Sequence, residues 1–98
     1  MLPITYLAPA KKYFKKLTEQ PLRKAYLEAI QHIRNEPFSG DLKSGDLSGI
    51  YGYDVFYKGT NYEIAYRLEE NEDGELIVVI MAGSRENFYE QLKRYLKN

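Results

Sequence analysis

The side chains that could do chemistry in this sequence are one histidine, ten tyrosines and a mixed set of lysines, arginines and carboxylates. Without cysteine the chain can form neither disulfides nor thiolate metal ligands, and His32 alone cannot build a zinc site. We therefore expect no metal and no cofactor. Tyrosines interleaved with Lys and Arg could stack on nucleic-acid bases, but tyrosines more often belong to a sheet core with wetted hydroxyls. His32 lies on the flank of an expected helix, where a solvated side chain is the simpler interpretation.

The formal net charge is zero, which argues against a generic binder of polyanions. The charges are nevertheless uneven, because residues 1–34 carry seven basic and two acidic side chains, residues 35–74 three and nine, and residues 75–98 four and three. A local positive surface forms if the helices gather the basic ends on one side, and solvated helix faces are the alternative. No run approaches the roughly 20 apolar residues of a membrane span. We expect a cytoplasmic protein.

One predicted strand carries charged side chains on a single face. In a strand over Tyr62–Glu69, alternation sends Glu63, Ala65 and Arg67 to one face and the aromatic side chains to the other. Asp54 joins the charged face if the preceding hairpin is in register. We expect the aromatic face to meet the helices and the charged face to form an open surface. An ion pair between Glu63 and Arg67 is the simplest interpretation of that pair.

The elements that must position these side chains are mostly helices in the first part of the chain and strands in the later part. Ile4–Leu7 predicts a short strand ending at Pro9. A short amphipathic helix follows, in which an apolar stripe opposes four lysines. A second helix is predicted from a cap at Thr18 to Asn35-Glu36-Pro37, and the two helices form an antiparallel hairpin. The apolar positions of the two helices are Tyr13, Phe14, Leu17, Leu22, Ala25, Tyr26, Ala29, Ile30 and Ile33.

Three strands are expected after the helices. The glycine-rich segment Phe38–Gly49 predicts a surface loop long enough to be functional. Ile50–Tyr57 and Tyr62–Glu69 are rich in aromatic and β-branched residues and flank the turn Lys58–Asn61. The unbroken apolar run Leu76–Ala82 indicates a central strand that is covered on both faces.

The last predicted helix begins at Ser84, with an apolar stripe of Phe88, Leu92, Tyr95 and Leu96 and basic residues in its final turn. The resulting order is β-α-α-β-β-β-α. It predicts a single α+β domain over residues 1–98, in which a helical hairpin packs on one face of a mainly antiparallel four-stranded sheet, with a C-terminal helix.

Three segments, in this order, resemble toxins of the RelE/ParE toxin-antitoxin superfamily. Leu47-Ser48-Gly49-Ile50-Tyr51 is similar to the Leu-Ser-Gly-aromatic entry to the second strand in YoeB-like members. Tyr62-Glu63-Ile64-Ala65-Tyr66 is similar to a Tyr-Arg-aliphatic-aliphatic-Tyr segment. Gly83–Tyr89, followed by Leu92–Leu96, resembles the tail of RelE-like members, in which a glycine, an arginine and a tyrosine lead into a basic helix. The resemblance covers nearly the whole chain.

The resemblance implies a toxin held inactive by a cognate antitoxin protein. It implies either a ribosome-dependent endonuclease that cuts mRNA and inhibits translation, or, in the ParE branch, an inhibitor of DNA gyrase without nuclease chemistry. A degenerate member that keeps only the antitoxin-binding surface is a third possibility. Cutting RNA without a metal requires a group to take the 2′-hydroxyl proton, cations for the charge on phosphate, and a proton donor for the leaving oxygen.

Arg85 and Tyr89 match the arginine and tyrosine of the family tail. The resemblance implies that Arg85 holds the scissile phosphate, helped by the amides of the helix capped by Ser84, and that Tyr89 stacks on a base or positions a proton. The alternatives are an exposed Arg85 beside Glu86, and a Tyr89 that only packs within its helix.

The sequence departs from the family at three other positions. Tyr53 and Asp54 stand where YoeB-like members have two arginines, and Glu63 stands where the hairpin arginine is expected. These changes oppose phosphate binding. Arg67 could supply a cation on the same strand face as Glu63, with Glu63 as a general base.

An antitoxin segment is the expected protein partner. A groove beside the last helix, lined by Phe88, Leu92 and Tyr95, would suit an amphipathic segment, although these residues could equally be core. The lysine-rich faces Lys11–Lys16 and Lys93–Lys97 would attract an acidic partner and would raise its on-rate more than its affinity.

Overall fold

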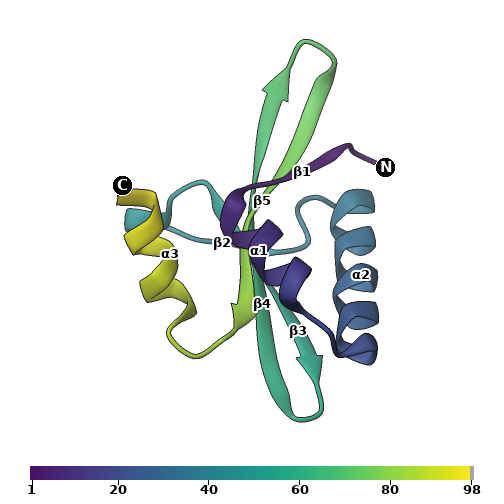
Figure 1. Ribbon diagram of the computed structural model, residues 1–98. Helices are drawn as coiled ribbons and strands as arrows, with labels where there is room; N and C mark the ends of the chain where they lie inside the picture. The colour runs from purple at the N-terminus through teal and green to yellow at the C-terminus, as the bar shows by residue number, and fades with distance from the viewer. Residues whose placement is uncertain (98) are drawn as a thin grey trace.

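The computed structural model describes residues 1–97 of the chain. Five strands form one sheet in the order β1-β5-β4-β3-β2, in which β1 runs parallel to β5 and all other neighbours are antiparallel. Figure 1 shows α2 and α3 on opposite sides of this sheet. The elements are β1 (Ile4–Tyr6), α1 (Ala8–Lys16), α2 (Gln20–Asn35), β2 (Asp41–Leu42), the 3-10 helix η1 (Gly45–Leu47), β3 (Ile50–Tyr57), β4 (Thr60–Asn71), β5 (Gly74–Ser84) and α3 (Phe88–Lys97).

Helices α1 and α2 cover one face of the sheet, as the sequence predicts. Their apolar stripes meet the aromatic face of β4, where Tyr66 is fully buried, and the alternate residues Ile77 and Val79 of β5. The rings of Phe14 and Tyr26 pack edge to face with centroids 5.2 Å apart, which joins the two helices. The aromatic face of the predicted strand therefore meets the helices, and its charged face is left for the other side of the sheet.

Helix α3 packs on that other side over a second, smaller core. A β-bulge between β4 and β5 pairs Ala65 with Met81 and Tyr66 with Val79, so Ile80 is an extra residue. Both Ile80 and Met81 then belong to the α3-side core. The apolar run of β5 is central and covered on both faces, as predicted, because its residues serve both cores.

The hairpin of β3 and β4 is in the predicted register. Asp54 lies directly opposite Glu63. The turn itself is tighter than expected, because only Lys58 and Gly59 lie between the strands, with φ of 49° and 74°. Two successive positive φ values are typical of the two-residue turn that matches the twist of antiparallel strands.

The strand count differs from the prediction. The sheet has five strands rather than four, because Asp41–Leu42 within the expected loop pairs with β3 as the edge strand β2. A single turn of 3-10 helix, Gly45–Leu47, follows it and buries Leu47. Such short elements could not be predicted from this mostly polar segment, because two paired residues are too few to show a periodic pattern.

Three predicted boundaries are wrong. Pro9 lies in the first turn of α1 instead of ending a strand, and Glu19 rather than Thr18 precedes α2. Ser84 does not cap α3, because β5 continues through it, paired with Tyr62, and the helix begins at Phe88. Strand pairing is a tertiary interaction and here overrides the local preference of serine for a helix cap.

Candidate functional site

A shallow acidic floor lies on the α3 face of the sheet. Asp54 of β3 and Glu63 of β4 are cross-strand neighbours, and Glu63 also pairs with Gly83 of β5. Gly52 and Gly83 lie near the two carboxyls and have no side chains, so neither residue covers the sheet surface beside Asp54 and Glu63. Glu63 is only 2% exposed and is the one buried charged side chain among residues 1–97.

Two side chains from the chain after β5 reach Glu63. The hydroxyl of Tyr89, in the first turn of α3, donates a hydrogen bond of 3.1 Å to Glu63 Oε2. The Nε of Arg85 lies 3.8 Å from Oε1. Burial raises the pKa of Glu63 to about 7, helped by the hydrogen bond and charge of Asp54 and opposed by Tyr89 and Arg85. Glu63 can therefore both accept and release a proton near neutral pH.

Tyr89 is held as a hydrogen-bond donor. Burial, reinforced by the charge and hydrogen bond of Glu63, raises the pKa of Tyr89 well above its ordinary value. The phenol therefore keeps its proton at neutral pH. A Cβ at Gly52 would overlap the Tyr89 hydroxyl, so the contact between α3 and β3 requires glycine there.

Lys43 is a member of the site that sequence patterns do not indicate. It follows the edge strand β2, and its Nζ lies 4.9 Å from the centre of the Tyr89 ring. Its backbone N–H donates to the carbonyl of Ile50 at 2.8 Å, which continues the pairing of β2 with β3. The one available signal in the sequence is that Lys43 is the sole basic residue between Arg34 and Lys58.

The two predicted arginines lie in different surroundings. Arg85 follows β5 directly, and its backbone N–H donates a hydrogen bond of 3.0 Å to the carbonyl of Asn61. Its side chain is 62% exposed and points toward Glu63. Arg67 forms an ion pair with Glu69, and the predicted pair with Glu63 is wrong. Arg67 lies four positions along the strand from Glu63, or roughly 13 Å away. The structure thus brings together Glu63, Arg85 and Tyr89, and leaves Arg67 apart.

The comparisons with known proteins place this fold in a family. The model of the ParE-like toxin of type II bacterial toxin-antitoxin systems matches residues 4–93. The chain belongs to this family. The predicted resemblance to RelE/ParE toxins is thereby confirmed, and the chain is the toxin of a type II system.

Solved structures share the fold of this ParE-like toxin at low sequence identity. The YoeB/ParE toxin from Agrobacterium tumefaciens is 13% identical, with a TM-score of 0.68, and the match covers 86% of this chain and 99% of that one. The RelBE2 toxin-antitoxin complex from Mycobacterium tuberculosis is 20% identical, with a TM-score of 0.63 and coverage of 86% and 98%. The intact RelBE complex of E. coli is 16% identical, with a TM-score of 0.63 and coverage of 85% and 95%. No curated protein sequence matches the chain.

Tyr53 and Asp54, which the resemblance placed at arginine positions, lie on opposite faces of β3. Only Asp54 faces the site, as the partner of Glu63. Tyr53 lies on the opposite face, where its hydroxyl is 2.6 Å from Nδ1 of His32. His32 is exposed, as predicted, but it contacts Tyr53 and lies across the sheet from Glu63.

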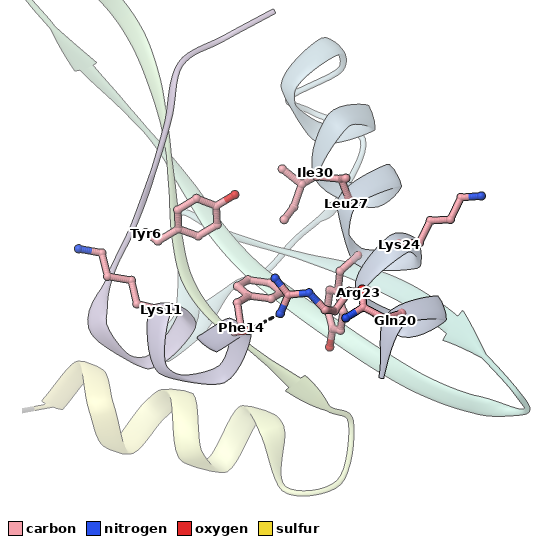
Figure 2. Close-up of a pocket in the computed structure, with 9 residues that line it drawn as sticks. Tyr6, Lys11, Phe14, Gln20, Arg23, Lys24, Leu27 and Ile30 are labelled. Atoms are coloured by element: carbon pink, nitrogen blue, oxygen red, sulfur yellow. Dashed lines mark hydrogen bonds between the residues drawn. The ribbon is translucent and has the colours of Figure 1, made fainter. Parts of the chain in front are cut away.

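A cavity of about 560 Å³ lies far from this chemistry, on the α1–α2 face of the ParE-like toxin. Figure 2 shows it between β1, α1 and α2. Its lining residues are Tyr6, Lys11, Phe14, Gln20, Arg23, Lys24, Tyr26, Leu27 and Ile30. The groove predicted beside α3 is wrong, because Phe88 and Leu92 are 2% and 0% exposed and belong to the α3-side core.

None of the helices within residues 1–97 has the length and apolar character needed to cross a membrane. The same residues contain no group of three or more histidine, aspartate or glutamate side chains that could hold a metal ion.

Proposed function

We propose that this ParE-like toxin is an endoribonuclease that cuts messenger RNA without a metal, with Glu63 as its general base. The observation that supports this is the state of Glu63, which is buried, has a pKa of about 7 and contacts both Tyr89 and Arg85. A general base is most effective when its pKa lies near the working pH. An ordinary surface glutamate would be too weak a base to take a hydroxyl proton.

In the proposed reaction, two of these three side chains transfer protons and the third stabilises charge. The carboxylate of Glu63 takes the proton of a ribose 2′-hydroxyl, and the 2′-oxygen bonds to phosphorus as the bond from phosphorus to the 5′-oxygen breaks. Tyr89 gives its proton to the leaving 5′-oxygen and recovers one from Glu63 through their hydrogen bond of 3.1 Å. Arg85 stabilises the charge on the phosphate oxygens. The products are a 2′,3′-cyclic phosphate and a 5′-hydroxyl.

The substrate is RNA presented by a larger assembly. A net charge of zero gives the toxin little affinity for free RNA, since nonspecific binding depends on basic side chains that neutralise phosphates. Messenger RNA held in the ribosome needs no such affinity, because the ribosome supplies the binding surface. The toxin would then act in the cytoplasm and inhibit translation.

Induced expression in a bacterium tests the proposal, with growth and transcript ends as the readouts. The wild type should stop growth and leave cut transcripts. Glu63→Gln, Arg85→Ala and Tyr89→Phe should each reduce cleavage by roughly 10²-fold or more. Glu69→Gln, an exposed carboxylate on the same strand, is the matched control and should cut normally. Growth arrest with intact transcripts would overturn the proposal.

The same experiment separates two alternatives. An inhibitor of DNA gyrase is favoured by the Asp54–Glu63 pair, because two adjacent carboxyls repel a phosphate when both are ionised. It predicts arrest with intact transcripts and poorly supercoiled DNA. A degenerate member that only binds its antitoxin predicts no arrest at all.

We further propose that the cognate antitoxin docks in the cavity between α1 and α2. Two of the similar structures are toxin-antitoxin complexes. The cavity has apolar walls that include Leu27, which is 58% exposed, and it carries Lys11 and Lys24 among its lining residues. Apolar walls with cations suit an acidic amphipathic segment.

Antitoxin rescue of growth tests this docking site. Leu27→Glu should leave the toxin active but lower its affinity for the antitoxin by at least 10-fold, because a carboxylate would have to be buried in the interface. Phe38→Glu changes another exposed apolar side chain, 67% exposed, outside the cavity and should be neutralised normally. Equal neutralisation of both variants would place the antitoxin elsewhere.

A further inference from the structure

We propose that Lys43 binds the scissile phosphate, and that it supplies from the edge of the sheet a cation that the acidic floor lacks. The identity of the phosphate as RNA rests on the proposed function. The anion site itself can be tested without any cleavage.

Lys43 lies close to both Tyr89 and Gly52. Its Nζ lies 4.9 Å from the centre of the Tyr89 ring. A Cβ at Gly52 would lie 2.9 Å from Cε and 3.4 Å from Nζ of Lys43, and it would also overlap the Tyr89 hydroxyl. The Lys43 side chain and the Tyr89 hydroxyl therefore fill the space above Gly52 together, which brings the ammonium close to the phenol. A phosphate that accepts a hydrogen bond from Tyr89 would lie within reach of Lys43.

The positive charge of Lys43 is available to a phosphate. Ion pairs among residues 1–97 include Lys58–Glu19, Arg67–Glu69 and Arg85–Glu63, and Lys43 takes part in none of these three. Its side chain is half-buried and rests on an aromatic ring, a weaker attraction than that of a phosphate. Arg85, in contrast, is partly neutralised by Glu63.

The electrostatics favour the transition state over the resting state. With Glu63 ionised, its charge and that of Asp54 offset Lys43 and Arg85. When Glu63 takes the 2′-hydroxyl proton, one of those negative charges disappears as negative charge develops on the phosphate. Two cations then face the phosphate, and Asp54 is the remaining carboxylate of the Asp54–Glu63 pair. Preorganised charge of this kind lowers the barrier because it acts where new charge forms.

The backbone that carries Lys43 is anchored. The fully buried Tyr66 hydroxyl accepts a hydrogen bond from Gly40 N–H at 3.0 Å and donates one to the Pro37 carbonyl at 2.8 Å. Lys43 itself is tied to Ile50. The backbone of Lys43 is thus held in place, while the four-carbon side chain lets the ammonium move from the Tyr89 ring to a phosphate.

Phosphate titration of the purified toxin, followed by amide NMR, tests the site directly. Inorganic phosphate should shift the amide signals of Gly52, Arg85 and Tyr89 in the wild type. Lys43→Met should weaken this binding at least 10-fold. Lys58→Met is the matched control, because Lys58 also lies over a tyrosine ring, at 5.4 Å from Tyr57, but on the exposed hairpin. It should bind phosphate like the wild type. Unchanged binding by Lys43→Met, or no shifts at these residues in the wild type, would overturn the proposal.

Cleavage assays distinguish failure of this proposal from failure of the proposed function. In the endonuclease assay Lys43→Met should lower the rate by roughly 10²-fold, and Lys43→Arg should restore part of it. If the wild type cuts RNA and Lys43→Met cuts equally well, the role of Lys43 is refuted and the nuclease stands. If the wild type never cuts RNA but phosphate binding depends on Lys43, the anion site stands and the nuclease is refuted. Thermal unfolding of both variants shows whether they fold.

Discussion

The hydroxyl of Tyr89 and the carboxyl of Glu63 meet at 3.1 Å, although one belongs to the first turn of α3 and the other to the middle of β4. This contact joins the C-terminal helix to the sheet through a titrating group. Activity and stability should consequently depend on the same proton.

Glu63→Gln should change the pH dependence of stability. The folded pKa of Glu63 is raised from 4.5 to about 7, so the unfolded chain releases this proton first, and the contribution of Glu63 to stability is lost as pH rises from about 4.5 through 7. The substitution removes that loss and should stabilise the protein at pH 8 by about 1 to 3 kcal/mol. Urea unfolding at pH 5 and pH 8 measures it. The same pH slope in the variant and the wild type would contradict the raised pKa of Glu63.

The cleavage rate should follow the ionisation of Glu63. Because only the carboxylate can take the 2′-hydroxyl proton, the rate should rise with pH up to about 7 and then level off. Single-turnover cleavage between pH 5 and 8.5 measures this profile. A profile that Glu63→Gln leaves unchanged would assign the base to another group.

Gly52→Ala should disrupt the site. The new Cβ would overlap the Tyr89 hydroxyl and crowd Lys43, so the variant should lose most cleavage and about 1 to 3 kcal/mol of stability. Gly83→Ala is the matched control, because its Cβ would meet only Phe88, at an ordinary 3.8 Å. Thermal unfolding and cleavage are measured on both. Equal effects would show that the close approach at Gly52 is not needed.

Tyr66→Phe should loosen the segment that carries Lys43. It leaves the Gly40 N–H and the Pro37 carbonyl without their buried partner, at a cost of about 1 to 3 kcal/mol. Tyr51→Phe changes the ring stacked on Tyr66, with centroids 5.2 Å apart, and should cost less, since the Tyr51 hydroxyl makes no hydrogen bond within residues 1–97. Urea unfolding compares the two. Faster amide exchange at Lys43 in the first variant alone would confirm the anchoring.

Lys58→Asn should stabilise the β3–β4 hairpin. Lys58 has φ of 49°, a region that asparagine adopts more readily than lysine, and Asn-Gly is the preferred sequence for this turn. The ion pair lost with Glu19 is exposed and contributes little. A gain of about 0.5 to 1 kcal/mol is expected in urea unfolding. A loss would show that the ion pair matters more than the turn geometry.

Local patterns in the sequence were sufficient for the register of the β3–β4 hairpin and for the side chains that share its charged face. The predicted open surface is wrong, because α3 covers Glu63 and Ala65 there. Strand alternation has a period of two, and a tight turn sets the register, so Asp54 and Glu63 could be paired from sequence alone. The helices on the aromatic face followed from the same reasoning. The placement of Arg85 and Tyr89 near Glu63 rested on resemblance to the family.

The tertiary structure decided the rest, because it depends on how distant segments pass one another. Serine capping and strand pairing competed at Ser84, and the hydrogen bonds of β5 with β4 prevailed. Arg67 lies on the predicted face but too far along the strand, and only side-chain geometry shows that it pairs with Glu69. Lys43 enters the site because an edge strand of two residues brings its loop over Gly52. Such a long-range approach has no periodic signal in the sequence, since it is set by packing between elements far apart in the chain.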